Sequence, residues 1–78
     1  MLENIEFVHD WFAEVETTPG RMRQVAFRRG KRLHAQVCAV GRGEHATELA
    51  DLRLADGTIA RRVPLARFAV VSRHTHAA

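Results

Sequence analysis

Four cations stand within five residues of this chain, on both sides of one glycine, Gly30. They are Arg28, Arg29, Lys31 and Arg32. Arginine and lysine at this density can bind several phosphates, and binding of that kind weakens as the salt concentration rises. A second basic pair, Arg61 and Arg62, could extend the same patch. These six residues are the predicted nucleic-acid-binding site, and the alternative is a solvated turn whose charges favour solubility.

The aromatic and histidine residues offer weaker chemistry. Trp11 and Phe12 could stack on nucleic-acid bases, although aromatic residues at helical spacing more often belong to a core. His74 and His76 form a His-x-His pair near the end of the chain. A metal site needs three or four ligands with support around them. We therefore expect no metal at this pair.

Catalysis finds little support in the sequence. Glu44 and His45 could exchange a proton, but no nucleophile or third orienting group accompanies them. The single cysteine, Cys38, falls in a predicted strand, where a buried, inert thiol is the default. The sequence holds no phosphate-cradling glycine loop and no Cys-x-x-Cys pair. We expect a protein that is not an enzyme and needs no cofactor.

Charge is distributed unevenly along the 78 residues. Residues 1–16 hold five acids and no lysine or arginine. Residues 17–78 hold all 12 lysines and arginines against the other four acids, a balance of +8 (12 − 4). Such asymmetry favours a nucleic-acid surface, an acidic partner, or association between the two parts of the chain.

The basic turn needs two flanking segments to position it. Residues 22–40 alternate apolar and polar side chains on both sides of Gly30, and a period of two is typical of a half-buried strand. Glycine takes the positive φ that a hairpin turn requires without steric cost. We expect a hairpin of two strands with the cations at its exposed tip.

Residues 2–16 support two interpretations. One is an amphipathic helix, because apolar residues recur at helical spacing. These residues are Leu2, Ile5, Val8, Phe12 and Val15. The other makes the second half a strand, because the apolar residues also alternate from Trp11 to Thr17. We expect the helix, ended by a turn at Pro19-Gly20.

Turn signals also divide the second half of the chain. Asp56-Gly57 is typical of a hairpin turn, followed by a returning strand at 59–63 that Pro64 interrupts. The residues after Pro64 suit a single 3₁₀ turn. Residues 68–72 are expected to form a last short strand, and residues 73–78 a frayed tail.

These elements predict one mainly β domain of the α+β type over residues 1–78. An acidic helix (1–16) would pack on a basic, five-stranded, strongly bent antiparallel small barrel (21–72), since closure hides the strand edges. The predicted core is Val8, Phe12, Val25, Phe27, Leu33, Val37, Leu52, Leu54, Ile59, Phe68 and Val70.

The predicted order of segments resembles the Sm-like fold, an SH3-like small barrel of which Hfq and the Rho-inhibitor family Rof are bacterial members. VAFRRGKRLHAQV at 25–37 looks like the first Sm motif, and RVPLARFAVVS at 62–72 is similar to the second. The Asp56-Gly57 turn and the step at 65–68 look more like Rof than Hfq. The Lys-His pair through which Hfq-type proteins bind uridine-rich RNA is replaced here by Arg62-Val63-Pro64.

Two functions follow from the charge and the resemblance. The first is a small regulatory module that binds RNA or single-stranded nucleic acid through a basic barrel face. The alternative, implied by the resemblance to Rof, is a protein-interaction adaptor that modulates transcription by docking on Rho or another transcription protein. Sm-like rings pair edge strands between neighbours, and Pro64 near that seam favours a monomer or dimer.

A single thiol without a signal peptide predicts a cytoplasmic location. No apolar run approaches the ~20 residues that a membrane helix needs, so no membrane partner is expected.

Overall fold

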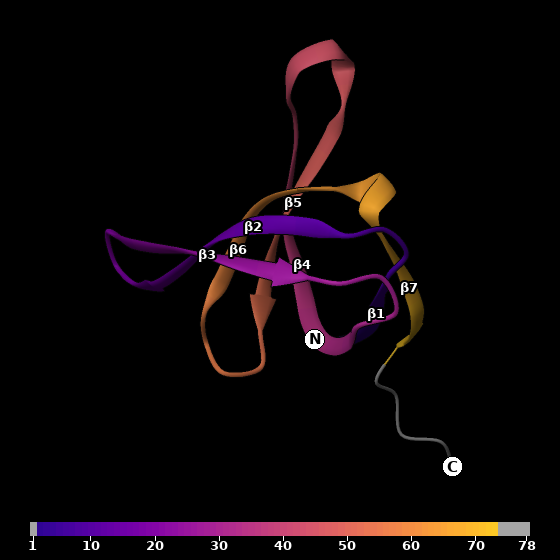
Figure 1. Cartoon of the computed structure of the whole chain (residues 1–78), viewed down its shortest axis with the longest axis horizontal. Coiled ribbons are helices and arrows are strands. Elements are labelled where there is room, and N and C mark those ends of the chain that lie inside the picture. The colour runs from indigo at the N-terminus through magenta and orange to yellow at the C-terminus, as the bar shows by residue number, and fades with distance from the viewer. Residues whose placement is uncertain (1, 74–78) are drawn as a thin grey trace.

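The computed structural model describes residues 2–73 and shows one antiparallel sheet of seven strands. The elements are β1 (Glu3–Phe7), β2 (Trp11–Thr18), β3 (Arg21–Phe27), β4 (Arg32–Arg42), β5 (Glu48–Leu54), β6 (Ile59–Pro64) and β7 (Phe68–Arg73), with 3₁₀ turns η1 (Glu44–Ala46) and η2 (Leu65–Arg67). The strand order is β3-β2-β6-β5-β4-β1-β7 (Figure 1). Within the described residues, no helix is long and apolar enough to cross a membrane.

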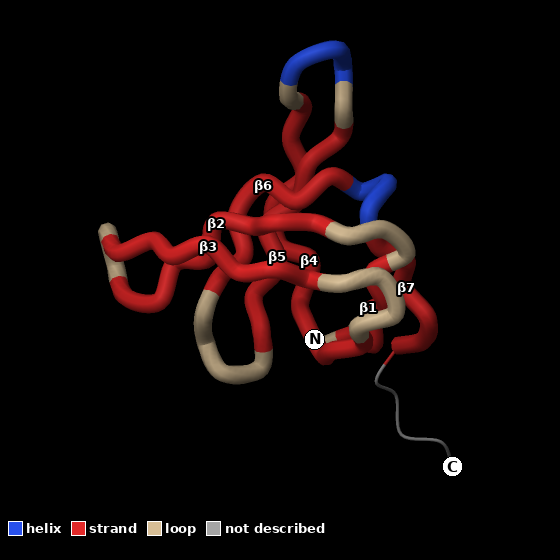
Figure 2. Tube along the Cα trace, in the orientation of Figure 1, coloured by secondary structure: helices blue, strands red, loops and turns tan. Residues whose placement is uncertain are grey.

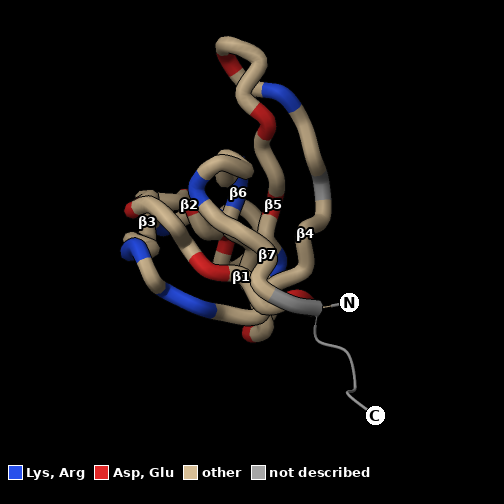
Figure 3. The backbone as a smooth tube through the Cα atoms, turned by 90° about the vertical axis from the view of Figure 1, so that its right-hand side faces the viewer, with Lys and Arg blue, Asp and Glu red and all other residues tan. Residues whose placement is uncertain are grey.

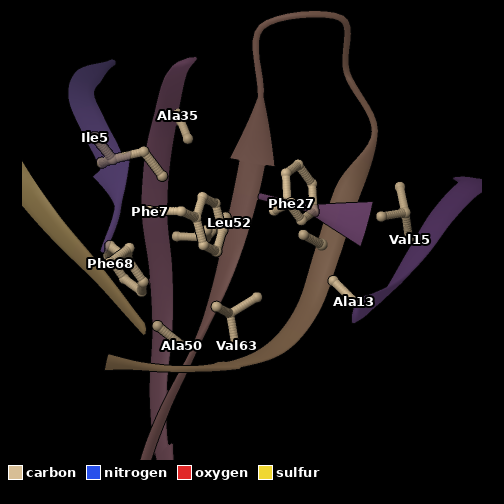
Figure 4. Close-up of a cluster of buried hydrophobic side chains, with 11 residues drawn as sticks. Ile5, Phe7, Ala13, Val15, Phe27, Ala35, Ala50, Leu52, Val63 and Phe68 are labelled. Carbon is tan, nitrogen blue, oxygen red and sulfur yellow. The ribbon is translucent and has the colours of Figure 1, made fainter. Parts of the chain in front are cut away.

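The sheet is strongly bent but stays open. Phe7 on β1 stacks on Phe27 of edge strand β3, with ring centroids 4.7 Å apart. On its other side Phe7 meets Phe68 of the opposite edge strand β7, at 6.1 Å. The two edges therefore approach each other around one aromatic cluster (Figure 4), although each edge strand pairs with only one neighbour. The predicted five-stranded, Sm-like or SH3-like barrel is wrong, because the N-terminal segment supplies two further strands to an open sheet.

The core lies on the concave side of this sheet. It consists of Ile5, Phe7, Ala13, Val15, Phe27, Ala35, Ala50, Leu52, Ala60, Val63 and Phe68. Of the predicted core, Phe27, Leu52 and Phe68 are confirmed. Val25, Leu33, Val37 and Leu54 are half-buried against it, as is Ile59 at the start of β6. The prediction that Val8, Phe12 and Val70 belong to the core is wrong, since their exposed fractions are 36%, 55% and 47%.

The predicted helix at residues 1–16 is wrong, because this segment forms β1 and β2. β1 lies between β4 and β7, and β2 lies between β3 and β6. Burial follows a period of two, with Ile5 and Phe7 inside on β1 and Ala13 and Val15 inside on β2. The strand interpretation of the second half is therefore confirmed. Pairing on both sides satisfies the backbone of this segment and overrides the helical spacing of its side chains.

The predicted hairpin over residues 22–40 is also wrong in its pairing. Both strands exist, but β3 pairs with β2 through the Pro19-Gly20 turn, and β4 pairs with β1 and β5. Gly30 does adopt the expected positive φ, +90°. The Lys31 N–H donates to the Arg28 carbonyl at 2.9 Å. The basic turn is thus a corner between strands that lie apart in the sheet.

The second half of the chain follows the prediction closely. β5 and β6 form the hairpin expected at Asp56-Gly57, with Gly57 at φ +90°. Asp56 Oδ1 accepts hydrogen bonds from the Thr58 N–H (2.9 Å) and hydroxyl (2.6 Å). The 3₁₀ turn η2 and the last strand β7 are also confirmed. The predicted tail lies almost entirely outside the described residues.

The β4–β5 hairpin forms an arm that extends away from the rest of the sheet, with η1 at its tip (Figure 2). At the base of the arm, β6 passes into η2 through Pro64. Pro64 ends a strand that lies between β2 and β5, whereas the free edges belong to β3 and β7. Pro64 therefore lies on neither free edge of the sheet, so it does not block pairing of an edge strand with another chain.

Candidate nucleic-acid interface

The basic turn lies against the connection between β1 and β2. The Arg29 backbone N–H donates to Asp10 Oδ1 at 2.7 Å, and Arg28 Nη1 lies 3.7 Å from Asp10 Oδ2. The Arg28 guanidinium also sits 5.5 Å from the centre of the Phe12 ring. The Phe12 side chain is exposed to solvent, and the Arg28 guanidinium covers part of its ring in a cation–π contact.

Acids from the N-terminal segment neutralise half of the predicted cation cluster. Besides the contact of Arg28 with Asp10, Arg32 Nε donates to Glu6 Oε1 at 2.7 Å across the β4–β1 pair. Within residues 2–73, the side chains of Arg29 and Lys31 make no ion pair. Arg29 and Lys31 are thus the cations of this turn that have no acidic partner among the described residues.

The Arg61-Arg62 pair does not extend the turn as one unit. Arg61 is bound on the outer face of the sheet, with Nε 3.0 Å from Glu16 Oε1 and Nη1 2.8 Å from Asp51 Oδ2. These hydrogen bonds raise the pKa of Arg61. The side-chain hydrogen bond from Arg61, followed by the N–H of Gly20, holds the pKa of Glu16 below its ordinary value. Arg61 is a structural residue in this arrangement.

Arg62 occupies a bulge in β6. The β5–β6 register shifts between Ala50 and Leu52, so that Asp51 faces both arginines. Arg62 has a left-handed φ of +55°, which is uncommon for a residue with a side chain. Its N–H donates to Asp51 Oδ1 at 3.0 Å. One carboxylate therefore holds the bulge and separates the two arginines, leaving the Arg62 side chain without an ion pair in the described part of the chain.

Arg62 lines a groove of about 510 Å³ at the base of the arm. The groove is formed by the start of β2, the base and tip of the β4–β5 arm, and η2. Its lining residues are His9, Trp11, Gly43, Glu44, His45, Thr47, Leu49, Arg62, Pro64, Ala66 and Arg67. Apolar walls, two arginines and two histidines thus surround one concave surface that contains a single acid.

Trp11 is the aromatic wall of this groove. It is half-buried, and the Arg67 guanidinium lies 5.4 Å from the centre of its ring. Its Nε1–H is buried without a hydrogen-bond partner in residues 2–73, although indole donors in folded proteins usually find one. The proximity of Arg67 to Trp11 could not be read from the sequence, since 56 positions separate them.

The groove and the basic turn lie on two sides of the same short segment. The Gly30 N–H donates to the Phe7 carbonyl at 2.7 Å, and the Phe7 N–H donates to the Lys31 carbonyl at 2.9 Å. On the other side, the Val8 N–H donates to the Arg67 carbonyl at 2.9 Å. Within this segment His9 lines the groove, whereas Asp10 contacts the turn.

The remaining candidates have clear positions. Cys38 is exposed on β4, so the prediction of a buried thiol is wrong. Glu44 and His45 lie in η1, where His45 has a φ of +57°. His74 and His76 fall outside the described residues. Within residues 2–73, no three metal-ligating side chains come together.

Comparison with known proteins leaves the site to be interpreted from its own residues. No protein-family model matches this chain, and no curated protein or solved structure matches it.

Proposed function

We propose that this protein is a small regulatory binding module, and not an enzyme, that takes single-stranded RNA or DNA into the groove beside Trp11. The observation that carries the proposal is the meeting of one aromatic wall with two arginines from different elements, Arg62 of the β6 bulge and Arg67 of η2. Proteins that bind single strands combine these parts, a stacking surface and a cationic path for the backbone.

The dimensions and chemistry of the groove support this assignment. A volume of about 510 Å³ lies in the range of small-ligand sites, roughly 300–1,000 Å³. Any of the nucleic-acid bases can stack against an aromatic or guanidinium plane, so stacking is largely independent of the sequence of the strand. Arginine presents a planar fork of donors that matches a phosphate. Binding should therefore depend strongly on salt and weakly on sequence.

The bulge supports the same assignment. Residues with a left-handed φ cost roughly 1–3 kcal/mol and persist where the surrounding structure holds them. Here Asp51 holds Arg62 in that conformation. The resulting backbone places an arginine at the groove that a regular strand would direct elsewhere, because consecutive strand residues face opposite sides of a sheet.

Trp11 provides a direct test, because it is the only tryptophan in the chain. Oligouridylate and oligoadenylate titrated at low salt should quench its fluorescence, and added salt should reverse the quenching. Arg67→Ala should weaken the affinity of both oligonucleotides, measured by fluorescence anisotropy of a labelled strand. Trp11→Ala should weaken it about 5- to 150-fold, the equivalent of about 1–3 kcal/mol for one stacked base.

Met22→Ala is the control, since Met22 is an exposed apolar residue on β3 that does not line the groove. It should bind oligonucleotides within about twofold of the wild type. Wild-type protein that neither quenches nor binds at low salt would overturn the proposal. The Rof-like adaptor remains the alternative, and pull-down from nuclease-treated lysate distinguishes it: a stoichiometric transcription protein that survives nuclease would favour the adaptor.

A further inference from the structure

Asp10 occupies the position at the basic turn that an external anion would take. Its carboxylate accepts the Arg29 backbone N–H at 2.7 Å and faces Arg28 Nη1 at 3.7 Å. A backbone N–H beside an arginine is a common set of phosphate contacts in nucleic-acid complexes. The Asp10 carboxylate therefore stands where a phosphate oxygen would be held.

This contact is built so that it can exchange. The side chains of Arg28 and Asp10 are 69% and 54% exposed, and exposed ion pairs contribute little to stability. Arg29 and Lys31 add two cations at the same turn that form no ion pair within residues 2–73. A multiply charged anion can thus form more ion pairs with the turn than the single Asp10 carboxylate does.

We propose that the basic turn is a phosphate subsite that Asp10 keeps closed from within the chain, and that a strand bound in the groove opens it by displacing this carboxylate. The link to the strand rests on the function proposed above. The anion site itself rests on the geometry of the turn. Asp10 therefore competes with external anions for the turn. This competition lowers the affinity of the turn for short anions more than its affinity for strands that reach from the groove to the turn.

The groove and the turn are close enough for one strand to reach both. Trp11 pairs with Phe27 across β2 and β3, and the basic turn begins at the next residue, Arg28. His9 on the groove side and Asp10 on the turn side are consecutive. A strand whose base contacts Trp11 therefore crosses the segment at residues 8–10 before its phosphates reach Arg29 and Lys31.

The first test compares Asp10→Asn with Glu6→Gln. Both remove one negative charge and one ion pair to an arginine, but Glu6 contacts Arg32 on the β4–β1 pair. Asp10→Asn should tighten the binding of an eight-nucleotide oligouridylate about three- to tenfold at low salt, and should steepen its salt dependence by about 0.7 for one added phosphate contact. Glu6→Gln frees the Arg32 side chain of the same turn but leaves the Arg29 N–H bound to Asp10, so it should tighten binding clearly less than Asp10→Asn does. An equal gain in both variants would mean a general charge effect and would overturn the subsite.

The second test uses inorganic tripolyphosphate and does not depend on RNA binding. Titration should shift the ¹H–¹⁵N resonance of the Arg29 amide, with a lower dissociation constant in Asp10→Asn than in the wild type. The Gly20 amide, which donates to Glu16 at the opposite end of the β2–β3 hairpin, is the internal control and should not move. If oligonucleotides fail to bind but tripolyphosphate shifts Arg29, the proposed function fails and the anion site stands. If the Arg29 amide stays unchanged in both proteins, the anion site is wrong.

Discussion

At the scale of one residue, Asp51 holds both an ion-pair network and a strained backbone conformation. Its two oxygens contact neighbouring residues, Oδ2 the Arg61 side chain at 2.8 Å and Oδ1 the Arg62 backbone at 3.0 Å. The first contact ties three strands together through Glu16. The second maintains a left-handed arginine, which is strained, at the edge of the groove. Strain held at a groove is expected where it serves a ligand.

Arg62→Gly should therefore change stability and binding in opposite directions. Glycine adopts a φ of +55° without strain, so we expect about 0.5–1 kcal/mol of added stability after the entropy of the unfolded chain is subtracted. Oligonucleotide affinity should fall. Arg53→Gly is the matched control, because Arg53 is exposed on β5, and it should lose about 0.5–1 kcal/mol of stability. Urea unfolding measures both, and a destabilised Arg62→Gly variant would show that the bulge carries no strain.

Glu16 should make stability depend on acid. Its pKa is held low in the folded state, first by the side-chain hydrogen bond from Arg61. A lowered folded pKa stabilises the protein above the ordinary glutamate pKa, about 4.3, and this contribution is lost as the pH falls through the folded pKa. Glu16→Gln should therefore be less stable than the wild type at pH 7, and the gap should close at pH 2–3. Urea midpoints at both pH values measure it, and a gap that persists in acid would contradict this role.

At the scale of elements, the bent sheet is held by its aromatic cluster. Phe7 of an inner strand contacts one phenylalanine on each edge strand. β7 is also bulged, because the register with β1 shifts between Asn4 and Ile5. Bulges on an edge and charged residues such as Arg21 and Arg23 on β3 discourage pairing with other chains. A monomer or dimer remains the prediction for this protein.

Phe68→Ala and Phe12→Ala give a matched pair for this architecture. Phe68 is 7% exposed and Phe12 is 55% exposed. Truncating Phe68 should cost roughly 3–5 kcal/mol, because it leaves a cavity between the edges of the sheet. Truncating Phe12 should cost less than about 1 kcal/mol. Thermal and urea unfolding measure both, and the reverse order would instead fit a core helix at residues 2–16.

At the scale of the whole molecule, the charge asymmetry of the sequence becomes interleaving in space. The acidic segment supplies β1 and β2, each of which lies between two other strands of the sheet. Its acids therefore meet arginines in Glu6–Arg32, Asp10–Arg28 and Glu16–Arg61 contacts. Figure 3 shows acidic and basic residues interspersed over this side of the protein. Within residues 2–73, the sequence asymmetry becomes pairing between neighbouring strands, and these contacts neutralise part of the basic charge.

Local signals in the sequence were enough to locate the turns and most strands. Gly30 and Gly57 adopt the positive φ expected of them, because glycine is the residue that takes this conformation without a steric penalty. The 3₁₀ turn after Pro64 and the strand after it depend on similarly local rules. The basic turn was found for the same reason, since four adjacent cations need no tertiary information to be noticed.

The partners of each strand, and with them the site, were decided only by the tertiary structure. In residues 2–16 the apolar residues fit a helical and an alternating pattern, and neither pattern records that β4 and β7 lie on either side of β1. Strand pairing is non-local, so its energy depends on residues far away in the chain. The groove could not be predicted for the same reason, because Trp11, Arg62 and Arg67 become neighbours only after the sheet bends and the bulge at Asp51 forms.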